Sequence, residues 1–107
     1  MTWPVYTKQL GFLSGATQQV DFPVPAGKVW VVTDMIAVIL DETKVGDLII
    51  ASSAGTRMWW VHSVAGATDA SHFWASKTVI PAGQNLICAI AAGTWDWMAV
   101  GYELNAV

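Results

Sequence analysis

The side chains in this chain that can bind a metal or act as nucleophiles are few and scattered. The sequence has two histidines, His62 and His72, and one cysteine, Cys88, which lies in an apolar run between Ile87 and Ala89. A zinc site takes three or four nitrogen or sulfur ligands, and a reactive thiol needs a basic neighbour. We therefore interpret the histidines as strand residues with local hydrogen bonds and Cys88 as a small core residue, and we predict no metal site.

Acidic residues suggest a calcium site at one loop. Asp41, Glu42 and Asp47 flank this loop, but they lack the Asp-x-Asp-x-Asp-Gly spacing of a calcium-binding loop. A solvated acidic loop is the favoured interpretation. The sequence also has no Gly-x-Ser-x-Gly motif to present a nucleophilic serine, and a single cysteine excludes an internal disulfide. We predict that the protein is not an enzyme and needs no cofactor.

The seven tryptophans are stronger candidates for a functional surface. Neighbouring residues of a strand point to opposite faces, so Trp59 and Trp60 cannot both enter one core. An exposed indole anchors a protein interface or stacks on a sugar ring. We predict an interface or ligand-stacking site formed by Trp3, Trp59, Trp95 and Trp97. The alternative, that both faces of the last strand are covered within the domain, stays open.

Turn residues divide the chain into short apolar runs. The phrases Val24-Pro25-Ala26-Gly27 and Ile80-Pro81-Ala82-Gly83 each end one run and begin the next. The predicted strands cover residues 5–10, 17–22, 28–40, 47–51, 57–63, 72–79, 85–90 and 96–104. This pattern favours a single all-β domain over residues 1–107, an antiparallel β-sandwich of about eight strands with jelly-roll-like topology. Residues 1–10 form an N-terminal arm or an edge strand.

Alternation along the last predicted strand assigns its two faces. One face carries Trp95 and Trp97. We expect the other face to fill the core, and it consists of Met98, Val100, Tyr102 and Leu104. In the preceding strand, Leu86, Cys88 and Ile90 share a face that we also place in the core.

Composition indicates a protein that buries part of its surface against partners. Apolar residues make up 54% of the chain and charged residues only 12%, and a domain of this size cannot hide that much apolar area internally. We therefore predict a homo-oligomer. The net charge of −3 does not indicate the positively charged surface that binds nucleic acid. No apolar run reaches the ~18–20 residues of a membrane span, and the N-terminus lacks the pattern of a secretory signal.

Three segments carry a resemblance to a known group of proteins: VPAGKVWVVTD from Val24 to Asp34, VIPAGQNL from Val79 to Leu86, and GYEL from Gly101 to Leu104. In these segments the chain resembles the small β-sandwich virion proteins of tailed bacteriophages, which are minor tail components or capsid-surface decoration. The resemblance implies a non-enzymatic structural subunit, located in the virion and bound to copies of itself and to other virion proteins. The alternative is a carbohydrate-binding, lectin-like module for host attachment, which takes glycans as ligands.

Overall fold

The computed structural model describes residues 7–41, 44–66 and 71–106, and this part of the chain is built from β-strands. The strands are β1 (Lys8–Ala16), β2 (Val20–Pro23), β3 (Lys28–Ile39), β4 (Gly46–Ser52), β5 (Arg57–Ser63), β6 (Ser71–Ile80), β7 (Asn85–Ala92) and β8 (Trp95–Asn105). Among these residues there is no helix with the length and apolar character needed to cross a membrane.

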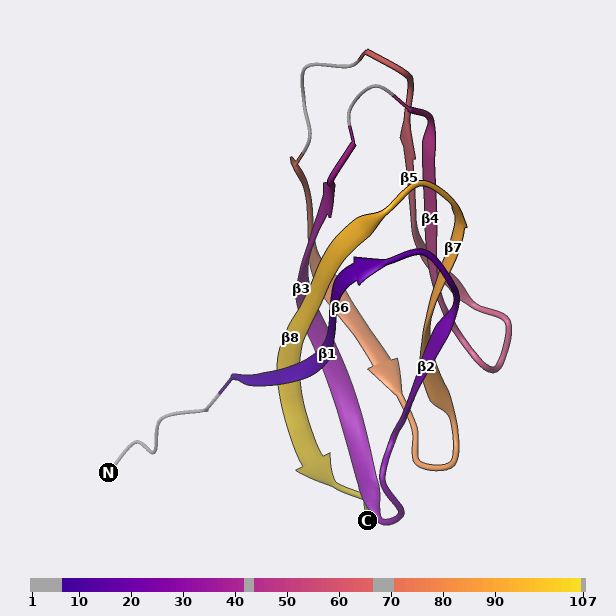
Figure 1. Cartoon of the computed structure of the whole chain (residues 1–107). Coiled ribbons are helices and arrows are strands. Elements are labelled where there is room, and N and C mark those ends of the chain that lie inside the picture. Colours follow the sequence, from indigo (N-terminus) through magenta and orange to yellow (C-terminus); the bar gives the residue numbers. More distant parts are fainter. Residues whose placement is uncertain (1–6, 42–43, 67–70, 107) are drawn as a thin grey trace.

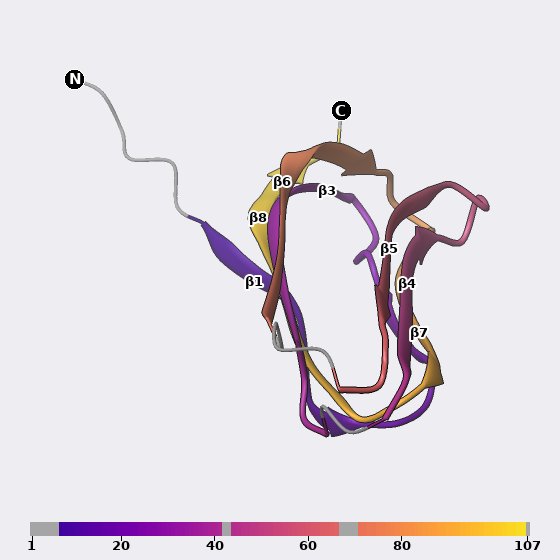
Figure 2. The ribbon, with the colours of Figure 1, turned by 90° about the horizontal axis from the view of Figure 1, so that it is seen from above.

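The strands form two antiparallel sheets that lie face to face (Figures 1 and 2). The first sheet has the strand order β1-β8-β3-β6, and the second has the order β2-β7-β4-β5. Strands β4 and β5 pair as a hairpin, whereas β1 and β2, β2 and β3, and β7 and β8 belong to different sheets. The chain therefore crosses repeatedly between the two layers. The prediction of an all-β antiparallel sandwich of about eight strands is confirmed.

The two Pro-Ala-Gly phrases make two of these crossings. In the first, the amide of Lys28 donates to the carbonyl of Pro25 over 3.1 Å, and Gly27 has a φ of 76°. The second phrase makes the corresponding hydrogen bond over 3.3 Å, with Gly83 at a φ of 83°. Glycine accepts such positive φ values without strain, and proline fixes the φ of the turn. Each phrase thus ends a strand in one sheet and starts the next strand in the other.

Large side chains from both sheets fill the space between them. Trp95 and Trp97 of β8 are only 0% and 1% exposed. The ring of Trp97 lies 5.6 Å from the ring of Phe22 in the second sheet, and the indole N–H of Trp95 donates to the carbonyl of Ala92 over 3.0 Å. Other side chains that are fully buried are Leu48, Ile50, Ile80, Leu86, Val32 and Cys88.

The sequence-based assignment of the two faces of β8 is wrong. Trp95 and Trp97 point into the core, and they are not available as an interface or a stacking platform. The side chains expected in the core point outward instead, and they are Met98, Val100, Tyr102 and Leu104. Both faces of this strand are apolar, so alternation alone does not say which one is inside. The inward face combines large indoles with small residues, and this combination fits the narrow space between two sheets.

A β-bulge in β3 decides which of its side chains face outward. The pairing of β3 with both neighbouring strands shifts register between Val32 and Asp34. Before the bulge Trp30 and Val32 are buried, and after it Met35 and Ala37 are buried. An uninterrupted alternation would turn Met35 outward. The bulge thereby leaves Asp34 exposed on the outer face of the first sheet.

The N-terminal segment is described from residue 7 onward. Strand β1 begins at Lys8 and pairs with β8, so it forms one edge of the first sheet. The remainder of the predicted arm, including Trp3, lies outside the described residues.

Candidate interaction surface

The outer face of the first sheet carries a row of apolar side chains that crosses all four strands. Ile36 of β3 lies opposite Phe73 of β6 on one side and opposite Met98 of β8 on the other. Met98 in turn lies opposite Phe12 of β1. Directly opposed side chains on one face of a sheet are in contact. Phe73 is 74% exposed, so one end of this row is largely in water.

A second apolar group lies further along the same face. Val31 of β3 is opposite Val79 of β6 and Tyr102 of β8. Of the eight large apolar side chains that are exposed in the described residues, four belong to this face: Phe12, Phe73, Val79 and Leu104. Single exposed apolar residues are normal on a protein surface, whereas a contiguous group marks an interaction site.

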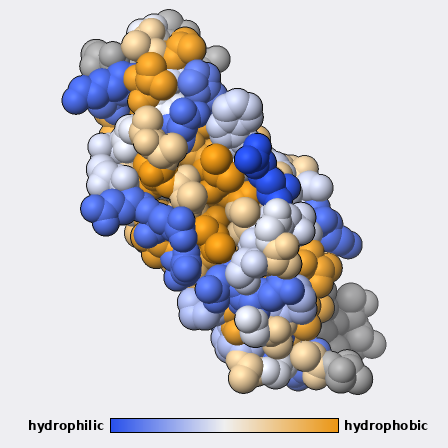
Figure 3. Space-filling model, turned by 90° about the vertical axis from the view of Figure 1, so that its right-hand side faces the viewer, coloured by the Kyte–Doolittle hydropathy of each residue, from blue (hydrophilic) through white to orange (hydrophobic). Residues whose placement is uncertain are grey.

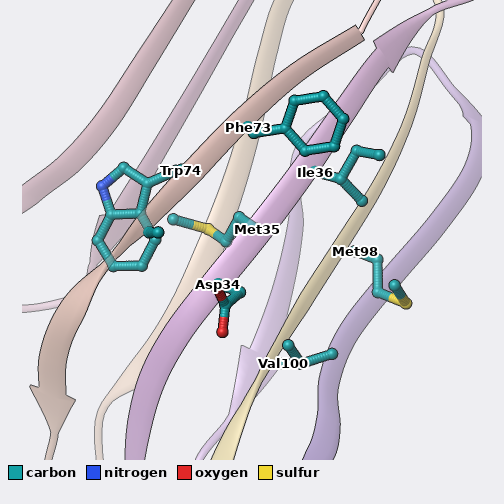
Figure 4. A pocket seen from close by; sticks show the side chains of 8 residues that line it. Asp34, Met35, Ile36, Phe73, Trp74, Met98 and Val100 are labelled. Atoms are coloured by element: carbon teal, nitrogen blue, oxygen red, sulfur yellow. The ribbon is translucent and has the colours of Figure 1, made fainter.

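A hollow of about 260 Å³ opens beside the first apolar group, where Ile36, Phe73 and Met98 line it (Figure 4). Asp34 lies in this zone, opposite Ala75 on β6 and Val100 on β8. The small side chain of Ala75 leaves the hollow open beside Phe73. The carboxylate of Asp34 accepts a hydrogen bond from the hydroxyl of Thr33 over 2.9 Å. A partner that inserts an apolar side chain and places a cation next to it would fit this hollow, because the walls are apolar and the carboxylate needs an opposite charge when it is covered.

The outer face of the second sheet has a different character. Its apolar side chains gather in the middle of the face between polar ones (Figure 3). On this face Asp47 accepts hydrogen bonds from the indole N–H of Trp60 over 3.2 Å and pairs with Nδ1 of His62 over 2.7 Å. The His62 hydrogen bond is the main cause that lowers the pKa of Asp47. These polar groups are already satisfied by one another.

A groove of about 440 Å³ runs between the edge strands β5 and β6. Both histidines line it, together with Trp59 and Trp60. Nε2 of His72 is buried and has no hydrogen-bond partner among the described residues. Trp59 points inward and packs partly against the core, whereas Trp60 is 57% exposed. Of the four predicted tryptophan sites, Trp59 therefore lines a groove, but the more exposed of the adjacent pair is Trp60.

The remaining candidate residues have structural roles. Cys88 is fully buried, and its burial raises the thiol pKa to about 12. Asp41 forms a 3.9 Å ion pair with Lys44, while Asp47 belongs to the cluster with His62. Glu42 lies outside the described residues. Within the described ranges, no group of three or more His, Cys, Asp or Glu side chains is arranged to hold a metal ion.

Sequence reasoning missed the apolar face because its rows depend on strand register. Phe12, Ile36 and Phe73 lie far apart in the sequence and become neighbours only through pairing with β8 and β3. The available signal was the run from Val29 to Leu40, which is apolar on both faces and therefore needs a cover on each side.

Comparisons with known proteins identify the fold. No family model and no curated protein matches this sequence. Among solved structures, the chain is similar to the Drosophila NLP core, whose crystal structure is described as giving insight into pentamer formation and histone binding. The two share 10% identity with a TM-score of 0.52, over 94% of this chain and 97% of that one. A similarity at this identity shows a shared fold.

This finding corrects the functional interpretation drawn from the sequence. The matched structure is described for pentamer formation and histone binding, so the expectations of a phage virion protein and of a virion location are wrong. The comparisons give no support to virion proteins or glycans as partners. Self-association, by contrast, agrees with the pentamer that the matched protein forms.

Proposed function

We propose that this protein is a non-enzymatic subunit that assembles with copies of itself through the outer face of its first sheet. The observation that carries the proposal is the row formed by Phe73, Ile36, Met98 and Phe12. Burial of apolar area contributes ~25 cal/mol per Å², and one aromatic side chain buries ~150–250 Å². Covering Phe73 and Phe12 alone therefore supplies several kcal/mol toward association.

The second sheet is a weaker candidate for this surface. Its most exposed aromatic side chain, Trp60, is already engaged with Asp47. Covering that cluster would remove water from a carboxylate and a histidine, and this desolvation opposes association. The outer face of the first sheet has an open apolar hollow instead, and a partner side chain fills such a hollow favourably.

Native mass spectrometry and light scattering over a range of micromolar concentrations test the proposal. The variant Val79→Asp places a charge on the proposed face and should weaken self-association by at least about tenfold. Val64→Asp is a matched control, because both valines are 57% exposed but Val64 follows β5 at the end of the other sheet. A parent protein that stays monomeric, or two variants that assemble as the parent does, would refute the proposal.

A second candidate function is the binding of basic proteins, histones among them. The histone binding named for the structural neighbour and the excess of eight acidic over five basic residues favour it. Core histones should bind at low salt and dissociate as salt screens the charges. Fluorescence titration with labelled histones measures this, and lysozyme serves as an unrelated basic control. Absence of histone binding, or equal binding of lysozyme, would rule this function out.

A further inference from the structure

Two opposite charges lie close together on the outer face of the first sheet. Asp34 is opposite Ala75, and Lys77 lies two residues further along β6 on the same outward-facing side. Both Asp34 and Lys77 are exposed. They occupy the zone between the two apolar groups, so a partner that covers these groups must also cover both charges.

Among the described residues of this sheet, Lys77 is the lysine whose ammonium group has no hydrogen-bond or ion-pair partner. Lys8 forms a 3.0 Å ion pair with Glu103, and the ammonium group of Lys28 donates to Asn105 over 2.7 Å. For Lys77 no ion pair or hydrogen bond occurs within residues 7–41, 44–66 and 71–106. Its ammonium group is therefore available to a second molecule.

Burial under an apolar partner makes each of these charges unfavourable unless an opposite charge meets it. A two-fold axis brings the same patch of both subunits together, so each residue i meets residue j of the other copy and each j meets i. With the axis between Asp34 and Lys77, each carboxylate faces an ammonium group. The face is then complementary to itself.

We propose that the outer face of the first sheet packs against the same face of a second copy across a two-fold axis, with Lys77 of each copy paired to the partner's Asp34. This inference rests on the proposed function and specifies its contact. In this arrangement the exposed ring of Phe73 is covered by the partner's outer face, whose hollow has one carboxylate among its apolar walls.

The size of the face agrees with a stable dimer. Four strands at a spacing of ~4.8 Å and a rise of ~3.3 Å per residue give a face on the order of 700 Å². The longest strand of this sheet, β3, has 12 residues. Standard protein interfaces bury roughly 600–1,000 Å² per partner, so a contact over most of this outer face falls within that range.

Charge reversal in separate copies tests the pairing. In Asp34→Lys all four facing groups of a dimer are positive, and in Lys77→Asp all four are negative. Each variant alone should dimerise at least about tenfold more weakly than the parent. A mixture of the two variants forms two attractive pairs again, so it should form heterodimers of near-parental affinity. The double variant Asp34→Lys/Lys77→Asp should likewise dimerise as the parent does.

Native mass spectrometry resolves the heterodimer, and circular dichroism confirms that each variant is folded. An attraction within one chain cannot be restored by mixing, so loss in both variants without rescue overturns the two-fold pairing. Parental dimerisation of either single variant overturns it as well. If Val79→Asp still abolishes assembly in these cases, the proposed function stands and only the pairing fails. If the parent itself is monomeric, both fail.

Discussion

The indole of Trp97 occupies the space that a side chain on Gly11 would need. A Cβ atom built on Gly11 would lie 2.6 Å from Cζ3 of Trp97, closer than real Cβ contacts. Gly11 is buried in β1, where the strand passes over the indole. The absence of a side chain at this position therefore allows a full tryptophan to enter the core beneath an edge strand.

Gly11→Ala is expected to destabilise the protein. The added methyl group forces the indole or the backbone of β1 to move, and overpacking of this kind costs about 1–3 kcal/mol. Urea unfolding followed by tryptophan fluorescence measures the free energy of unfolding. Ser14→Ala on the same strand is exposed and should stay within about 0.5 kcal/mol of the parent. Equal stability of both variants would show that the packing around Trp97 is looser than described.

Trp97→Ala should cost much more than Trp60→Ala, although both remove an indole. Trp97 is fully buried against Phe22, and truncating a buried aromatic costs about 3–5 kcal/mol. Trp60 is mainly exposed and loses one surface hydrogen bond to Asp47, so its loss should cost about 1 kcal/mol or less. Thermal or urea unfolding measures both losses of stability. A larger loss for Trp60→Ala than for Trp97→Ala would contradict the buried position of Trp97.

Turn residues and the alternation of apolar and polar residues made some parts of the fold predictable from the sequence. The Pro-Ala-Gly turns and the positions of most strands depend on local backbone preferences, so they were predictable from the sequence. Cys88 was also placed correctly, on the buried face that it shares with Leu86, although the other face of its strand carries Ile87 and is apolar too. In β8 both faces are apolar, and the choice between Trp97 and Met98 depends on which face the second sheet covers.

The interaction surface was less predictable than the core, for a related reason. The contact of Ile36 with Phe73 depends on register across β3 and β6, and the outward position of Asp34 depends on the bulge. Neither the register nor the bulge is visible in a single sequence. The surplus of apolar residues did indicate that a partner covers part of the surface, but it did not indicate which face is covered.

Cys88 should resist thiol reagents in the folded protein. Its side chain is fully buried, and burial raises the pKa of the thiol to about 12, so almost no thiolate is present near neutral pH. Labelling with a disulfide reagent should be slow in native buffer and fast in urea. A variant with Ser14→Cys adds an exposed thiol as a positive control. Rapid labelling of Cys88 in the native parent would contradict its position between the sheets.

Asp47 should contribute to stability above its unfolded pKa and lose that contribution in acid. Hydrogen bonds from His62 and then Trp60 lower the pKa of Asp47 in the folded state below the ordinary value of 3.8. The contribution is therefore complete above about pH 4 and disappears as the pH falls through the lower folded value. Because the pair lies at the surface, its size is below about 1 kcal/mol.

The variant Asp47→Asn isolates this effect. Relative to the parent it should be less stable near neutral pH, and the difference should shrink on going from about pH 7 to about pH 3, where the parent carboxylate becomes protonated. Urea midpoints at the two pH values measure the change. Asp21→Asn is the control, because Asp21 lies exposed on β2 and its one hydrogen bond within the described residues comes from the side chain of Gln19 over 3.0 Å. A stability difference for Asp47→Asn that is the same at both pH values would show that the folded protein does not favour the ionised form of Asp47.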